Sequence, residues 1–238
     1  MPAKAKKLGA VRRNKEGAVG GYTVLIDSQM RLGVKVEREF TFDEVKNEPM
    51  LFGCNRFYAE ALGGPLTLAF LESLPQEWID APDLVVDSRV HMLMPRWFPA
   101  IPGYHHDDVP RSREDGQPNY INPEYRSEHV MMLVNAEVCP TEFAIGAIDI
   151  TLPKVGDVIY KVWHPLVEAA LSFGALELRR VPDRTLAFFD DRTWHQATPA
   201  VSSGWRWFIR ASRNTHREPV NELRRQVQVY LEHPMEGW

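Results

Sequence analysis

Most of the chain shows apolar side chains in short β-branched runs or in alternation with polar ones, a pattern that predicts β-strands. One such run is 205–213, where Trp205, Trp207 and Ile209 alternate with a second set formed by Arg206, Phe208 and Arg210. Further strands are expected at 22–26, 34–40, 83–97, 128–138, 143–152, 176–181, 185–190, 193–198 and 226–230. Short strands that follow one another with turn signals between them are typical of a β-sandwich or barrel.

Helical spacing is confined mainly to the first third of the chain. The best candidate is 66–79, which follows Gly63-Gly64-Pro65 and is weakened in its second half by Pro75. A weaker candidate at 42–62 is interrupted by a proline and a glycine, and one short helix is expected at 165–171. Residues 108–127 are polar and predict a long surface loop of the kind that often binds substrate. We therefore expect a mainly β fold with helices packed outside, mostly N-terminal.

Length and composition fit one large globular domain. The chain has 238 residues, of which 44% are hydrophobic and 25% charged. Six basic residues and no acid lie in residues 1–15, although the net charge of the chain is −4. We expect residues 1–18 to form a basic, flexible tail, which could also contact an anionic partner, and residues 19–238 to form a single domain.

Composition also limits the location and the partners. Cys54 and Cys139 are too few for a disulfide framework, which fits a reducing, cytoplasmic setting. No run of 18 apolar residues is present, so no membrane span is expected. The acidic body argues against nucleic acid and favours a small-molecule substrate. Nothing in the sequence indicates the oligomeric state.

Candidate chemistry lies in the segment Gly103-Tyr104-His105-His106-Asp107-Asp108. Side chains at i and i+2 of an extended chain share a side, so either His105 with Asp107 or His106 with Asp108 offers an imidazole and a carboxylate to one point. His195 supplies a third ligand. Two histidines and one carboxylate leave other positions of a metal open, a geometry that suits non-heme Fe(II) and oxygen.

Arg206, Phe208 and Arg210 share one face of the 205–213 strand. A hairpin turn near Ala200 would place His195 opposite Arg206 and bring a guanidinium beside the metal. Buried arginines require an anion, and a guanidinium binds a carboxylate through two parallel hydrogen bonds. The alternative is that these arginines pair with the protein's own acids, such as Asp190 or Asp191.

Taken together, these residues resemble the Fe(II)- and 2-oxoglutarate-dependent dioxygenases over roughly 84–212. His105, Asp107 and His195 resemble the metal ligands of that family, and its frequent aromatic residue before the first histidine favours the 105/107 register. Arg206 resembles the arginine that binds the far carboxylate of 2-oxoglutarate, and Arg210 a second arginine that contacts cosubstrate or substrate.

The resemblance implies a double-stranded β-helix, a cupin-like jelly roll. It also implies a hydroxylase that uses O2, Fe(II) and 2-oxoglutarate and releases succinate and CO2. A cupin-like metal-binding protein or isomerase that does not use 2-oxoglutarate is the alternative. Other histidines, including His91, have no spaced partners and are expected to be ordinary surface or core residues.

Overall fold

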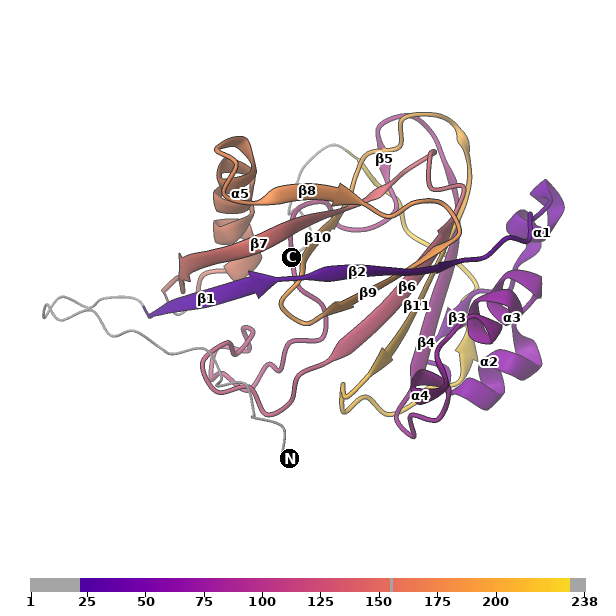
Figure 1. Cartoon of the computed structure of the whole chain (residues 1–238), viewed down its shortest axis with the longest axis horizontal. Coiled ribbons are helices and arrows are strands. Elements are labelled where there is room, and N and C mark those ends of the chain that lie inside the picture. The colour runs from indigo at the N-terminus through magenta and orange to yellow at the C-terminus, as the bar shows by residue number, and fades with distance from the viewer. Residues whose placement is uncertain (1–21, 155, 232–238) are drawn as a thin grey trace, which may run out of the picture.

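The computed structural model describes residues 22–154 and 156–231, and the predicted basic tail lies outside them. Antiparallel β-structure dominates, with helices at two sides (Figure 1). The helices are α1 (Phe42–Asn47), α2 (Arg56–Leu62), α3 (Pro65–Glu72), α4 (Gln76–Ile79) and α5 (Ile159–Ser172). The strands are β1 (Thr23–Ser28), β2 (Met30–Lys35), β3 (Leu51–Phe52), β4 (Val85–Leu93), β5 (Trp97–Phe98), β6 (Glu128–Val134), β7 (Thr141–Thr151), β8 (Glu177–Arg180), β9 (Thr185–Asp190), β10 (Trp194–Ala197), β11 (Gly204–Arg213), β12 (Glu222–Leu223) and β13 (Tyr230–Leu231).

Five strands form the larger sheet in the order β2-β9-β6-β11-β4. The strand β11 lies between β6 and β4, and its register places Arg206 opposite His91 and Arg210 opposite Asp87. Because alternate residues of a strand point to opposite faces, the two neighbours β4 and β11 each present one apolar and one polar face.

The smaller sheet has β7 at its centre. The first half of β7 pairs with β10 and with β8, and its second half pairs with β1. Gly146 lies where the partners change and has a φ of +134°, a conformation that a residue with a side chain rarely adopts. The chain passes between the sheets at Gln29, so β1 belongs to the smaller sheet and β2 to the larger one (Figure 1).

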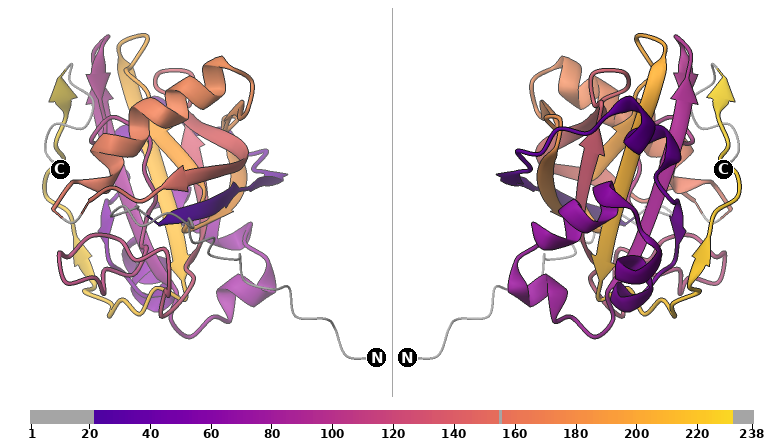
Figure 2. Two further views of the ribbon diagram at one scale, coloured as in Figure 1. Left: turned by 90° about the vertical axis from the view of Figure 1, so that its left-hand side faces the viewer. Right: turned by 90° about the vertical axis from the view of Figure 1, so that its right-hand side faces the viewer.

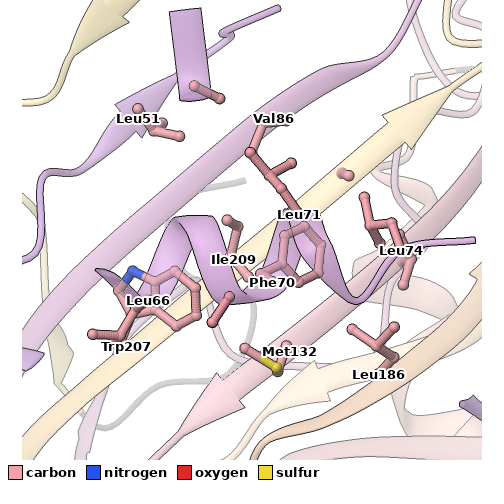
Figure 3. Packing of buried hydrophobic residues seen from close by; sticks show 14 of the residues in the cluster. Leu51, Leu66, Phe70, Leu71, Leu74, Val86, Met132, Leu186, Trp207 and Ile209 are labelled. Carbon is pink, nitrogen blue, oxygen red and sulfur yellow. The ribbon is translucent and has the colours of Figure 1, made fainter. Parts of the chain in front are cut away.

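Helices cover the outer faces of both sheets (Figure 2). On the larger sheet, α3 packs Leu66, Phe70 and Leu71 against residues of β4, β6 and β11, among them Trp207 and Ile209 (Figure 3). On the other side of the molecule, apolar residues of α5 pack against β1 and β7. These are the layers in which most of the apolar surface is buried.

Polar groups at the helix starts explain where the N-terminal helices begin. Thr41 and Glu44 form a reciprocal capping box at α1. The buried carboxylate of Glu48 accepts hydrogen bonds from the backbone N–H groups of Gly64, Leu66 and Thr67. That carboxylate satisfies donors that have no partner within α3 and complements the positive end of its dipole.

Between the two sheets lies a third apolar cluster that includes Met131, Phe143 and Phe189. It fills only part of the space between the sheets. Toward the edge strand β4 the facing side chains become polar, and a cavity opens there.

Several predicted boundaries were wrong. The strand expected at 34–40 ends at Lys35, and only the last residue of the strand expected at 226–230 is in β13. The helix expected at 66–79 is divided at Pro75 into α3 and α4. The short helix expected at 165–171 is the 14-residue α5, with Pro165 inside it. Among the described residues, no helix is long and apolar enough to cross a membrane.

Candidate functional site

The backbone brings His105 and His195 together across 90 residues of sequence. Each donates its backbone N–H to the carbonyl of the other, at 3.1 and 3.2 Å. Directly opposed residues of such an antiparallel bridge point to the same side, and the two imidazole centroids are 4.6 Å apart. A short piece of extended chain at 105 therefore continues the smaller sheet beyond β10.

Asp107 completes the group two residues after His105. One ligand atom from each of His105, Asp107 and His195 lies within 4.8 Å of the others. The Nε2 atom of His195 is 3.1 Å from the Asp107 carboxylate, and that of His105 is 3.8 Å from it. The structure therefore brings these three side chains to one point.

Carbonyl oxygens fix which ring nitrogens carry protons. Nδ1 of His105 is 2.8 Å from the Gly103 carbonyl, and Nδ1 of His195 is 2.9 Å from the Thr193 carbonyl. A carbonyl only accepts, so each Nδ1 donates, and each ring presents its Nε2 atom to the Asp107 carboxylate. The donor set and its orientation therefore fit a divalent metal held by two imidazoles and one carboxylate.

Charge states agree with this arrangement. Burial, reinforced by His195 next to it, lowers the pKa of His105 to about 4, so its ring is neutral at neutral pH. Burial alone would raise the pKa of Asp107, but Arg210 and the two histidines outweigh it and hold that pKa well below its usual range. A neutral imidazole and an ionised carboxylate are the forms that bind metals.

The structure places the neighbouring pair elsewhere. His106 is buried on the opposite side of the segment. Its ring packs against that of Trp194, with the ring centroids 3.8 Å apart, and its Nδ1 is 2.7 Å from the Tyr120 hydroxyl. Asp108 accepts a hydrogen bond from Arg210 at 3.1 Å. The geometry favours the 105/107 register over 106/108, and metal ligation by these residues remains a prediction.

Arg210 lies against the proposed ligands. Its guanidinium contacts Asp107 through Nη1 and Asp108 through Nη2. Burial would lower the pKa of Arg210, but the three nearby aspartates raise it, so the group is a fixed cation. The alternative that an arginine pairs with the protein's own acids therefore holds for Arg210, with Asp107 and Asp108 as its partners. The acids named in that alternative, Asp190 and Asp191, instead pair with Arg126.

Arg206 is 3% exposed and also faces the space between the sheets. Its Nε donates to the Cys139 carbonyl at 2.7 Å, and its Nη2 donates to the Thr141 hydroxyl at 3.0 Å. The hairpin register expected from the sequence was wrong: His195 pairs with Phe143 in one sheet, and Arg206 pairs with His91 in the other. The two residues thus lie in facing sheets, and both line the same cavity.

That cavity has a volume of about 360 Å³. One wall holds His105, Asp107 and His195, and the floor is the polar face of β4 and β11. Apolar side chains such as Phe189, Phe208 and Met131 complete the lining. A space of this size accommodates small organic molecules.

Several cavity residues were missed from the sequence. Asp87, Arg89 and His91 alternate along β4 and all line the cavity, and Thr141 orients Arg206. The prediction that His91 is an ordinary core or surface histidine was incomplete: it is 1% exposed and lines the cavity opposite Arg206. The available signal was three polar residues at period two within an otherwise apolar strand.

No family model matches the chain, and no curated protein matches it. Among solved structures, the chain is similar to EvdO2 from Micromonospora carbonacea var. aurantiaca complexed with 2-oxoglutarate, at 14% identity over 75% of this chain and 71% of that one, with a TM-score of 0.38. It is also similar to the non-heme monooxygenase ThoJ in its Ni complex, at 10% identity over 81% and 84%, with a TM-score of 0.33. The function of this chain is therefore inferred from its own side chains.

Proposed function

We propose that the protein is an Fe(II)- and 2-oxoglutarate-dependent dioxygenase that hydroxylates a small organic substrate. The observation that carries the proposal is the convergence of His105, Asp107 and His195 within 4.8 Å, in a cavity that also contains the buried guanidinium of Arg206. Metal ligands with open positions and a cation at a separate point are what a chelating dicarboxylate requires.

The strand order supports the fold that this function would need. Going along the chain, β6, β9 and β11 belong to the larger sheet, and β7, β8 and β10 to the smaller one. Two facing antiparallel sheets whose strands alternate in this way form the two halves of a double-stranded β-helix. We interpret the molecule as a cupin-like jelly roll with α1–α4 outside one sheet and α5 outside the other.

In this proposal, His105, Asp107 and His195 hold the iron, and Arg206 binds the far carboxylate of 2-oxoglutarate. Bound Fe(II) would supply the activation of O2. The overall reaction is balanced when one oxygen atom enters succinate and the other enters the substrate: 2-oxoglutarate, O2 and substrate C–H give succinate, CO2 and substrate C–OH.

Arg210 has a different proposed role from Arg206. Its contacts with Asp107 and Asp108 make it a positioning residue, which keeps the Asp107 carboxylate ionised and oriented. Direct contact between Arg210 and cosubstrate or substrate remains a prediction. Apolar residues of the cavity exclude water from the reacting groups.

Anaerobic addition of Fe(II) and 2-oxoglutarate to the purified protein tests the proposal. We expect a metal-to-ligand charge-transfer absorption band that needs both components, and succinate release when O2 and a suitable substrate are added. Arg206→Ala should raise the 2-oxoglutarate concentration needed for the band by tenfold or more, because a charge-assisted hydrogen bond pair is lost. Metal affinity should change little.

The matched control is Arg179→Ala, which removes the same charge from an exposed position on β8. Metal binding with no band and no effect of 2-oxoglutarate would contradict the proposal and favour the cupin-like alternative. An unchanged 2-oxoglutarate requirement in Arg206→Ala, with the band present, would reject only the role of Arg206.

A further inference from the structure

The cavity contains more positive than negative side chains. Five arginines line it, against three aspartates: Arg89, Arg206, Arg210, Arg217 and Arg224, with Asp87, Asp107 and Asp108. Each aspartate already has an arginine partner. Asp87 is held by Arg217 at 3.0 Å and Arg224 at 3.2 Å, and Arg210 contacts the other two.

Arg89 is a cavity arginine that pairs with none of these three aspartates. It lies on β4, between Asp87 and His91, and opposite Phe208 of β11. Within residues 22–154 and 156–231, no hydrogen bond or contact ion pair involves its guanidinium. By contrast, Arg206 donates hydrogen bonds to a carbonyl and a hydroxyl, and each of the other three cavity arginines pairs with a carboxylate.

The surroundings of Arg89 are unfavourable for a lone cation. Burial, with Arg224 and Arg210 nearby, lowers the pKa of this guanidinium, yet an arginine stays charged in proteins. Arg89 is partly buried, so its charge is neither fully hydrated nor paired by a carboxylate. A fold that keeps an arginine there gains stability when an anion binds to it.

Arg89 also lies where two hollows meet. A second hollow of about 1170 Å³, formed mainly by the C-terminal segment 221–230, adjoins the cavity. Arg89, His91 and Arg224 line both spaces, together with Phe52 and Pro99. A molecule that reaches the three proposed metal ligands through this hollow passes Arg89.

We propose that Arg89 binds an anionic group, a carboxylate or a phosphate, of the molecule that is oxidised, with Arg224 beside it. The assignment to the oxidised molecule rests on the proposed function, in which Arg206 takes 2-oxoglutarate, whereas anion binding at Arg89 does not depend on it. The planar guanidinium suits both anions, and Phe208 and Phe52 provide apolar contact for the rest of the molecule.

The test compares ligands of one shape and different charge. Protein loaded with Mn(II) and saturated with 2-oxoglutarate, without oxygen, is titrated with phenylacetate, benzylphosphonate and neutral phenylacetamide, and binding is measured by calorimetry. We expect at least one anion to bind about tenfold or more tightly than the amide. The stronger of the two anions identifies the group.

Arg89→Gln should abolish that preference, and Arg89→Lys should retain part of it. Arg179→Gln removes the same charge from an exposed site and should leave the preference intact. Arg89→Gln is expected to melt close to the wild-type temperature, because it removes no hydrogen bond or contact ion pair of the described residues. A melting curve of the variant therefore separates weak anion binding from unfolding.

Equal binding of amide and anions by the wild type, or an anion preference that survives Arg89→Gln, would overturn the inference. The first step of each titration, binding of 2-oxoglutarate, tests the proposed function separately. If 2-oxoglutarate does not bind, the same ligands are titrated into metal-free protein, where loss of the preference in Arg89→Gln still establishes the anion site.

Discussion

The two faces of the β4–β11 strand pair differ completely in chemistry although they share one backbone. One face presents Val90, Trp207 and Ile209 to α3, in a core from which water is excluded. The other presents Arg89, His91, Arg206 and further charged groups to a cavity. Period-two alternation thus gives a stabilising face and a reactive face, and the apolar face must supply stability that the charged one does not.

This contrast has a direct energetic meaning. Arg89 makes no hydrogen bond or contact ion pair with the described residues, although it is partly buried. A guanidinium of this kind adds little to stability until an anion binds to it. Changes on the cavity face should therefore affect binding more than folding, and changes on the core face should do the reverse.

The largest expected effect comes from the proposed metal ligands. His105→Ala should abolish turnover and weaken the binding of Mn(II) or Fe(II). Mutating a residue that only hydrogen-bonds to a metal ligand typically lowers metal affinity by roughly 10–100-fold, and removing a ligand itself should lower it further. His106→Ala should leave metal affinity nearly unchanged and lower stability, because His106 stacks on Trp194 and bonds Tyr120. Metal titrations and melting temperatures of both variants separate the two registers. The reverse pattern would show that the register is 106/108.

Next in size is a pair of truncations on adjacent residues of β11. Trp207→Ala should reduce the free energy of unfolding by about 3–5 kcal/mol, since its fully buried side chain leaves a void in a close-packed core. Phe208→Ala should cost less, because that side chain already borders the cavity. Urea denaturation measures both. Equal losses would mean that the two faces contribute alike, contrary to the comparison above.

Acidification gives a smaller, graded effect on the cavity face. Burial, with Arg206 and Arg89 close by, lowers the pKa of His91 from about 6.5 to about 4. Between these values the unfolded chain binds a proton that the folded protein does not, so stability falls as the pH decreases from about 6.5 to 4. The contribution of His91 to this loss of unfolding free energy is at most on the order of 3 kcal/mol.

Denaturation midpoints measured from pH 7 to pH 4 test this. His91→Gln keeps a donor for the Gln228 carbonyl but removes the titration, so its stability should decline less over the same range. Other buried histidines, such as His129, also have a lowered pKa and leave a residual slope. An identical pH dependence in His91→Gln and wild type would contradict the assignment.

Local patterns predicted much of the fold because they depend on neighbouring residues. The bounds of β9 were predicted correctly, and the alternation of β11 correctly separated the cavity residues from the core residues. The His105–Asp107 pair could be proposed because an i, i+2 relation in extended chain is itself local. The structure adds that His195 meets them.

Long-range pairing could not be read in the same way. The sequence suggested that β10 and β11 form a hairpin, since they are adjacent in the chain, but they belong to opposite sheets. For the same reason the neighbourhood of His91 and Arg206 was missed, because it depends on β4 pairing with β11 from more than 100 residues away. Because of Pro165 the sequence predicted only the second half of α5, although the buried residues of the whole helix recur at helical spacing.

The smallest predicted effect tests how Arg206 is oriented on the cavity face. Thr141→Val keeps the shape of the side chain but removes the hydroxyl that accepts from Nη2 of Arg206. The net value of one such bond is about 0.5–1.5 kcal/mol, so 2-oxoglutarate affinity should fall by roughly two- to tenfold. Thr151→Val, an exposed change on the same strand, provides the control.

If Thr141 matters only for folding, Thr141→Val should lower the melting temperature and leave the affinity for 2-oxoglutarate unchanged. If it positions Arg206, affinity should fall even where stability is equal, and Arg206→Ala should show no further loss from Thr141→Val because both act through one guanidinium. A double-mutant cycle measured by 2-oxoglutarate titration distinguishes the two. If the losses of 2-oxoglutarate affinity in the two variants simply add, Thr141 does not act through Arg206. The Cys139 carbonyl alone would then orient the guanidinium.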